Sequence, residues 1–365
     1  MSADRLVGVA TTVLFEAKAY VVFSFLFGLS FVHQMRAAAR DGDDVAARTT
    51  RRGVALIVVG VLHGVLLFVG DILLAYAILG FVLLGLRNMG TRRALVIAGL
   101  LYGAVSLVVL GVGGLAALLE SADPAAADAV ADQAAAARYA DPEEARAAYT
   151  GGLGPYLAFQ VHSYAAVGPS LLMIQAPLAF AAFLIGLVVG RHRLLERIVH
   201  REIPTGRLVA VMTAGLVLGG GLSVWSAALR WDAVGSGSAG AEAVGQGLVL
   251  LGGPVQALGY VLALLLILRA RAAARLTRLL GHAGRMSLSN YLGQSVVLAV
   301  VFSAWGAWAG LGLAGRLTPM QVGLVVVGLW SAQVLLSTLW MRAFRTGPVE
   351  GLLRASTYRR RPTWR

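Results

Sequence analysis

Nine long apolar blocks, separated by short arginine-rich or polar connections, constrain this chain more than any other feature. A transmembrane helix needs about 20 predominantly apolar residues, and repeated runs of that length are typical of polytopic membrane proteins. Composition agrees, because 58% of the residues are hydrophobic and only 13% are charged, whereas about a quarter are charged in soluble domains. We therefore predict an all-α, polytopic transmembrane helix bundle with about nine spans. The blocks cover residues 20–35, 53–69, 72–86, 94–119, 167–190, 208–229, 244–268, 286–310 and 320–341.

The basic residues predict the topology. Of 31 arginines and lysines, 25 lie at 36–52, 87–93, 191–207, 269–285 and in the tail 342–365. The positive-inside rule makes these stretches cytoplasmic, which puts the amino terminus outside and the carboxyl terminus inside. The same spread argues against a nucleic-acid partner despite the net charge of +13, because no single domain gathers the charge.

The chain divides into four parts: an N-terminal four-span unit (1–119), an external acidic, alanine-rich segment (120–166), a C-terminal five-span unit (167–341) and a basic cytoplasmic tail (342–365). In the external segment, Asp123-Pro124 and Asp141-Pro142 each resemble a helix N-cap followed by proline at the first helical position. Two short surface helices are expected there. Whether they form a lid or a solvated spacer is open.

Pairs of glycines four residues apart recur within the apolar blocks. Small residues at this spacing let helix backbones approach closely in a membrane. We predict such contacts at Gly60/Gly64, Gly186/Gly190, Gly215/Gly219 and Gly306/Gly310.

Ionisable groups near the outer ends of the first three spans predict a site. A charge inside a span costs a few kcal/mol, so each one needs a reason. His63 lies about 12 Å below the turn at Asp71, and Tyr76 about 7 Å below it on the returning helix. With Glu16 and Lys18 they can line one outward-facing pocket, with His63 and Asp71 catalytic and Glu16, Lys18 and Tyr76 binding substrate. A histidine with a carboxylate partner can act as a general base toward a hydroxyl.

Structural roles compete with this interpretation. Asp71 can simply cap the third span. His63, between two glycines, can be a packed histidine bonded across helices. Glu16 and Lys18 can form an interfacial pair that reaches water.

A second set of polar residues lies at the cytoplasmic ends of the spans. Arg51, Arg52 and Arg285 can hold an anionic nucleotide or phosphate. Asn290 and Gln294 share one helical face and point into the bundle. The alternative is that these arginines only fix the topology and meet lipid headgroups. No His, Asp and Glu set has metal-ligand spacing, so no metal site is expected.

Four ordered motifs resemble the YeiB-like bacterial inner-membrane family, a domain of unknown function. They are Lys18 with FSFLFG at 23–28, LHGVLLFVGDILLAY at 62–76, GRMSLSNYLGQS at 284–295, and WMRAFRTGPVE at 340–350 with Arg354, Thr357 and Tyr358. The family is remotely grouped with transmembrane acyltransferases. The resemblance therefore implies a multi-pass protein of the bacterial plasma (inner) membrane. It also implies an acyl-CoA as co-substrate on the cytoplasmic side, with no permanently bound cofactor, and a sugar or lipid acceptor outside. The resemblance also implies that the residues at the matching motif positions are important in this chain. They are Lys18, His63, Asp71, Tyr76, Arg285, Asn290, Gln294, Gly347, Pro348 and Glu350.

One departure from the family pattern affects the predicted topology. Such proteins open with a helix carrying an LDxxRG-type motif, which this sequence lacks. Adding that helix would give ten spans with both ends inside.

Two other functions compete with acyl transfer. A transporter or flippase for a small-molecule or lipid-linked substrate would use the same charged residues as a gated path, typically at broken helices. A non-catalytic membrane scaffold is the third. Membrane lipids are the expected partners in every case, and association into a homo-oligomer is left open.

Overall fold

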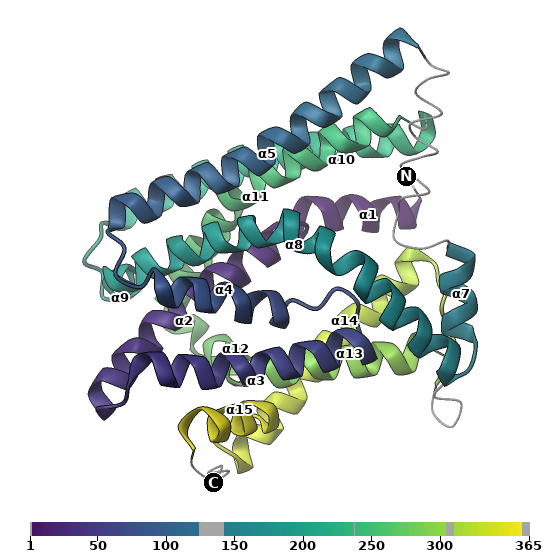
Figure 1. Cartoon of the computed structure of the whole chain (residues 1–365). Helices are drawn as coiled ribbons and strands as arrows, with labels where there is room; N and C mark the ends of the chain where they lie inside the picture. The colour runs from purple at the N-terminus through teal and green to yellow at the C-terminus, as the bar shows by residue number, and fades with distance from the viewer. Residues whose placement is uncertain (1, 124–141, 237, 304–309, 360–365) are drawn as a thin grey trace. The chain divides into compact units, whose positions relative to one another are not determined.

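The computed structural model describes residues 2–123, 142–236, 238–303 and 310–359 (Figure 1), and every regular element within these ranges is a helix. In chain order the elements are α1 (Ala3–Leu14), α2 (Lys18–Asp41), α3 (Val45–Leu66), α4 (Leu73–Gly85), α5 (Thr91–Ala122), α7 (Pro142–Thr150), α8 (Leu153–Arg191), α9 (Leu194–Val199), α10 (Thr205–Ser236), α11 (Ala239–Leu268), the 3-10 turn η1 (Arg271–Ala273), α12 (Ala274–Arg285), α13 (Ser287–Phe302), α14 (Pro319–Ala343) and α15 (Pro348–Tyr358).

Seven of the described helical segments are long and apolar enough to cross a membrane. They are Ala3–Asp41, Val45–Leu66, Thr91–Ala122, Met173–Arg191, Thr205–Trp231, Ala239–Leu268 and Pro319–Ala343. α4 and α13 are apolar but shorter. Each of the nine predicted blocks thus overlaps a helix, and the prediction of an all-helical membrane protein is confirmed.

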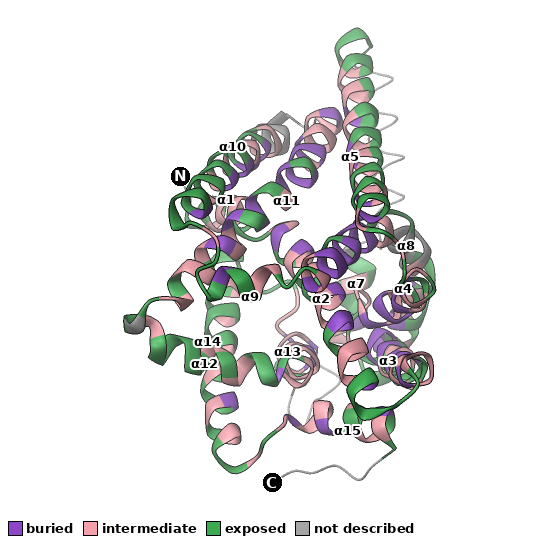
Figure 2. Cartoon of the chain, turned by 90° about the vertical axis from the view of Figure 1, so that its left-hand side faces the viewer, coloured by how far each residue is buried: buried purple, intermediate pink, exposed green. Residues whose placement is uncertain are grey.

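Large apolar side chains point outward from several of these helices. On α5 the exposed residues include Leu100, Leu107 and Val108, and on α14 they include Leu324 and Val327. Figure 2 shows exposed residues along much of α5. A water-soluble protein rarely leaves such contiguous apolar surface uncovered, whereas in a membrane it faces lipid.

The predicted span at 286–310 is too long. α13 ends at Phe302, and Ser303 is extended with φ −94° and ψ 148°. The backbone N–H groups of residues 311–314 donate to the last carbonyls of α13, at residues 300–303, over 2.9–3.2 Å. These bonds satisfy carbonyls that a helix end would otherwise leave without partners. Residues 304–309 lie outside the described part of the chain.

One of the two surface helices predicted for residues 120–166 lies within the described residues. α7 begins at Pro142 with Glu143 and Glu144 in its first turn, as the sequence predicts. The ring of Tyr149 packs against Tyr156 of α8, with centroids 5.3 Å apart. α7 is therefore packed against α8 as well as solvated. The helix predicted after Asp123 falls at 124–141, outside the described residues.

The chain forms two compact units, each combining three separated stretches. Unit 1 comprises Met1–Arg36, Asn88–Arg138 and Ile174–Arg271, and unit 2 comprises Ala37–Arg87, Tyr139–Met173 and Ala272–Arg365. These units cut across the predicted sequential division at 119 and 167, which concerns membrane topology and stays a prediction.

Within unit 1, glycines bring helices close together, as predicted. A Cβ placed on Gly219 of α10 would lie 2.5 Å from the backbone nitrogen of Gln256 on α11. A Cβ on Gly186 of α8 would overlap the α2 backbone at Phe25. Such contacts leave no room for a larger residue. Gly306 of the fourth predicted pair lies outside the described residues.

Candidate functional site

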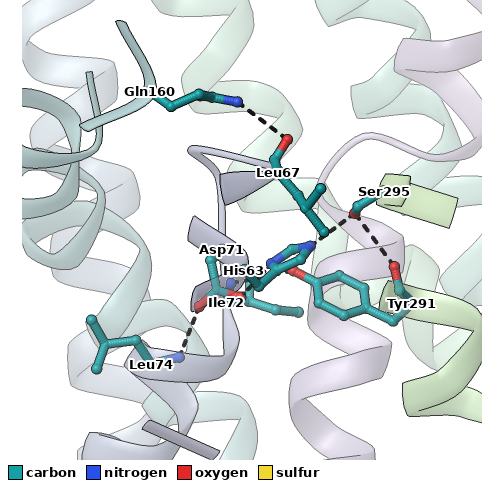
Figure 3. Close-up of polar contacts among 8 residues, drawn as sticks. All are labelled: His63, Leu67, Asp71, Ile72, Leu74, Gln160, Tyr291 and Ser295. Carbon is teal, nitrogen blue, oxygen red and sulfur yellow. Dashed lines mark hydrogen bonds and ion pairs between the residues drawn. The ribbon is translucent and has the colours of Figure 1, made fainter. Parts of the chain in front are cut away.

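Three side chains of unit 2 form a buried hydrogen-bonded chain (Figure 3). His63 Nδ1 lies 2.8 Å from Asp71 Oδ1, and His63 Nε2 lies 2.9 Å from Ser295 Oγ. His63 is 3% exposed and Ser295 7% exposed, and the Asp71 side chain is fully buried. The sequence predicted the first of these contacts but not the second.

The turn between α3 and α4 places Asp71. Its Oδ2 accepts a hydrogen bond from the Leu74 amide over 2.9 Å, at the start of α4. A Cβ on Gly60 would lie 2.6 Å from that amide nitrogen and 2.8 Å from Asp71 Oδ2. Only glycine at residue 60 therefore lets α3 approach the start of α4 closely enough for Asp71 to reach His63.

α8 holds the same turn from another side. The Tyr156 hydroxyl donates to the carbonyls of Leu66 and Leu67, and Gln160 Nε2 donates to Leu67 O over 3.2 Å. Figure 3 shows the bond from Gln160. Tyr156 and Gln160 are both fully buried. The turn that carries Asp71 is thus fixed by packed polar contacts.

α13 supplies the third member of the chain and an aromatic neighbour. The Tyr291 ring lies 4.9 Å from the His63 ring between centroids, and its hydroxyl accepts from the Ile72 amide over 3.4 Å. Ser295 Oγ is also 3.4 Å from the Tyr291 carbonyl. The Ser295 hydroxyl can therefore donate to the Tyr291 carbonyl or, at the shorter distance, to a lone pair on His63 Nε2.

The order Asp71, His63, Ser295 sets the direction of the hydrogen bonds between these three side chains. A carboxylate oxygen only accepts, so a neutral His63 carries its proton on Nδ1 and presents a lone pair on Nε2. That lone pair faces the hydroxyl of Ser295. The same order of carboxylate, imidazole and hydroxyl activates serine nucleophiles on unrelated folds.

Asp71 makes both contacts that the sequence suggested, one to His63 and one to the first turn of α4. His63 is also packed between glycines, with Gly60 against Asp71 and Gly64 against the Tyr164 ring. Tyr76 is buried on α4, one turn beyond Ile72. The catalytic and substrate-binding assignments stay predictions.

Glu16 and Lys18 belong to unit 1. Glu16 pairs with Arg230 over 2.7 Å. Lys18 is 1% exposed and donates from Nζ to Thr12 O over 2.7 Å, at the break between α1 and α2, where Ala17 has φ 63°.

The predicted cytoplasmic set is partly used for helix packing. Arg51 Nε donates to Thr357 O of α15 over 2.8 Å. Asn290 Nδ2 donates to Ala283 O and to Ser337 Oγ of α14.

The rest of the set has fewer partners. Arg52 is half-buried, and its Nε has no hydrogen-bond partner within the described residues. Arg285 is exposed and Gln294 half-buried, and neither side chain makes a hydrogen bond to another described residue. Among the described residues, no group of three or more His, Cys, Asp or Glu side chains is arranged to hold a metal ion. The cofactor-binding roles stay predictions, and within the described residues Arg52 Nε and the side chains of Arg285 and Gln294 are left as donors.

Glu350 has a position that the sequence motif alone did not explain. From α15 its Oε1 accepts from the amides of Leu288 (2.6 Å) and Ser289 (3.0 Å), and its Oε2 accepts from Ser289 Oγ. A carboxylate in this position neutralises the free N–H groups at the start of α13. Glu350 therefore anchors the helix that carries Ser295.

Fold and site together define an all-helical membrane protein with a buried Asp–His–Ser chain. Comparison with known proteins shows which proteins this chain resembles.

Residues 189–360 match the family described as "Protein of unknown function (DUF418)". The chain is 29% identical to the uncharacterized protein YxaH of Bacillus subtilis over 354 residues, covering 94% of this chain and 80% of YxaH. It is 27% identical to the uncharacterized protein YeiB of Escherichia coli over 352 residues, covering 94% and 82%. These similarities confirm the predicted resemblance to the YeiB-like proteins and their domain of unknown function. No solved structure matches the chain.

Proposed function

We propose that this protein is a membrane-embedded acyltransferase in which His63 acts as general base. One observation carries the proposal: a histidine buried among apolar helices has a carboxylate on Nδ1 and a hydroxyl on Nε2. Asp71 orients the imidazole and stabilises the positive charge that the ring gains when it takes a proton. The remote kinship of the family with transmembrane acyltransferases supplies the reaction class.

The proposed topology supplies the direction of transfer. We place the protein in the bacterial inner membrane with nine spans, the seven long ones together with α4 and α13, and with its amino terminus outside. His63 is then near the outer end of α3, where a sugar or lipid hydroxyl arrives. Ser295 lies eight residues along α13, or about 12 Å from its cytoplasmic start. The pantetheine arm of an acyl-CoA can span that distance, and Arg285 and Gln294 offer free donors toward it.

Transfer of a labelled acyl group tests this proposal. Detergent-purified protein is mixed with bacterial membrane lipids and either acetyl-CoA or palmitoyl-CoA, radiolabelled in the acyl group. We expect label in the lipid or glycolipid extract, and its loss in a folded His63→Gln variant. Absence of label from both donors with folded wild-type protein would contradict the proposal.

A transporter or flippase is the second candidate, and one observation favours it. The helix break at Phe15 to Ala17 exposes carbonyls that side chains satisfy: Val13 O accepts from Gln256 Nε2, and Leu14 O from the Tyr260 hydroxyl. Broken helices with a charged residue, here Lys18, are typical of transporter binding sites. Faster flipping of a fluorescent phospholipid in proteoliposomes than in empty liposomes would support this candidate. Flipping equal to that of empty liposomes would argue against a lipid flippase.

A further inference from the structure

In the observed hydrogen-bonded arrangement, His63 can accept a proton from only one neighbouring group. Nδ1 is occupied by Asp71 and Nε2 by Ser295. An acceptor hydroxyl would have to displace Ser295 to reach the base directly. The proton that His63 can remove in this geometry is that of Ser295 Oγ.

We infer that Ser295 is a nucleophile that carries the acyl group as a serine ester between donor and acceptor. This inference rests on the proposed function and adds to it a covalent intermediate at a named atom. General-base activation of a hydroxyl by an adjacent histidine is the usual way a serine becomes nucleophilic. The distance of 2.9 Å between Nε2 and Oγ is within the range that proton transfer requires.

The surroundings of Ser295 suit a covalent intermediate. α13 is held at its start by Glu350, and the Ser295 hydroxyl is confined between His63 and the carbonyl of Tyr291. With His63 and Ser295 both buried, little water reaches the ester. An acyl-serine protected from hydrolysis can wait for an acceptor hydroxyl.

The two steps balance. In the first, Ser295 Oγ gives its proton to His63 Nε2 and attacks the thioester carbonyl of an acyl-CoA. The C–S bond breaks, and the CoA sulfur leaves with the proton from Nε2. In the second, the acceptor hydroxyl gives its proton to Nε2 and attacks the carbonyl of the serine ester. The bond between the acyl carbon and Ser295 Oγ breaks, and Oγ recovers its proton from His63.

A Ser295→Ala variant would lose stability whether Ser295 is a nucleophile or only a structural residue, because His63 Nε2 would lose its hydrogen-bond partner in both cases. Stability therefore does not distinguish the two roles, and a partial reaction does. A covalent route exchanges CoA without any acceptor, whereas direct transfer from donor to acceptor needs both substrates together.

The experiment is isotope exchange with the full chain in detergent. Unlabelled acetyl-CoA or palmitoyl-CoA is incubated with radiolabelled CoA in the absence of acceptor, and label entering the acyl-CoA is measured. We expect exchange by the wild type, a fall of about 100-fold or more in Ser295→Ala, and an acyl adduct on residue 295 in peptide mass spectra of Ser295→Cys. Ser331→Ala is the matched control. Ser331 on α14 makes the same bond to the carbonyl four residues earlier, without a histidine, so exchange should be unchanged.

Two results would overturn the inference, and they separate it from the proposed function. Acyl transfer to lipid by the wild type without CoA exchange, and persisting in Ser295→Ala, leaves the acyltransferase intact and removes the serine ester. Absence of both transfer and exchange removes the acyltransferase, and the inference with it.

Discussion

At the scale of single residues, the site depends on which nitrogen of His63 carries the proton. Asp71 sets this, because a carboxylate can only accept from Nδ1–H. Asp71 also caps α4 through its second oxygen. The two functions can be separated by asparagine at residue 71. Its oxygen can still accept the hydrogen bond that caps α4, whereas its NH₂ group changes which nitrogen of His63 carries the proton.

Asp71→Asn should therefore lower acyl transfer much more than stability. The asparagine amide can donate to Nδ1, which moves the histidine proton to Nε2 and removes the lone pair that faces Ser295. We expect a fall in transfer rate of about 10³–10⁴-fold, the size seen when this tautomer is lost in serine triads. The unfolding temperature, measured by tryptophan fluorescence, should change by only a few degrees. A near wild-type rate would show that Asp71 is only a cap.

Gly60→Ala should displace Asp71 without changing any polar group. The added methyl would lie 2.8 Å from Asp71 Oδ2 and 2.6 Å from the Leu74 nitrogen. Overpacking of this kind costs about 1–3 kcal/mol of unfolding free energy, and transfer should fall with it. Gly85→Ala is the control, since its methyl would meet open space on α4. Equal stability of the two variants would contradict the close approach of α3 and α4.

The sequence predicted the His63–Asp71 pair but missed Ser295. The pair is separated by eight residues across one turn, so helix geometry alone brings the two residues near each other. Ser295 comes from 232 residues further along the chain. Its contact depends on how α3 and α13 pack, which no local pattern encodes. Helix packing likewise brings Asn290 of α13 to Ser337 of α14, and this contact was not predicted.

At the scale of elements, α15 connects the two helices that carry the site. Its first turn holds the start of α13 through Glu350. Its last turn lies on α3, where Arg51 donates to Thr357 O and the Arg48 guanidinium stacks 3.8 Å above the Tyr358 ring. α15 thus fixes α3 and α13 relative to each other on their shared side (Figure 1).

Glu350→Gln should weaken this connection. The amide has one oxygen left to accept the three hydrogen bonds at the start of α13, and the favourable charge is lost. We expect a loss of about 1–2 kcal/mol in unfolding free energy and slower acyl transfer, because Ser295 moves with α13. Glu144→Gln, at an exposed residue in the first turn of α7, should leave both measurements unchanged. A variant Glu350→Gln as stable and active as wild type would exclude a positioning role for α15.

Hydropathy located the elements better than it located their ends. Each of the nine blocks overlaps a helix, because twenty apolar residues have few other stable conformations in a membrane. The end of α13 at Phe302 was missed because the sequence stays apolar through the returning segment. α8 extends to Leu153, further than predicted, because polar Gln160 pairs with the turn after α3 and not with water.

At the scale of the whole molecule, the two units are built from interleaved stretches of chain. Hydropathy shows which segments are apolar but not which of them pack together. The contacts group residues 37–87 with the C-terminal helices, and this grouping brings His63 to Ser295.

The proposed topology has a direct test, because the chain contains no cysteine. A cysteine at exposed Gly152, between α7 and α8, should react with a membrane-impermeant maleimide on intact cells. A cysteine at exposed Thr277, on α12, should react only after the cells are permeabilised. Equal labelling of the two positions in intact cells would contradict the predicted orientation.

The central claim is that the Asp71–His63–Ser295 chain performs chemistry and is not only packing, and His63→Gln tests it most directly. Glutamine can donate to Asp71 and accept from Ser295, but it cannot take a proton at neutral pH. We predict that this variant folds with an unfolding temperature within a few degrees of wild type and transfers no labelled acyl group. A folded His63→Gln protein that transfers the acyl group at the wild-type rate would contradict the claim.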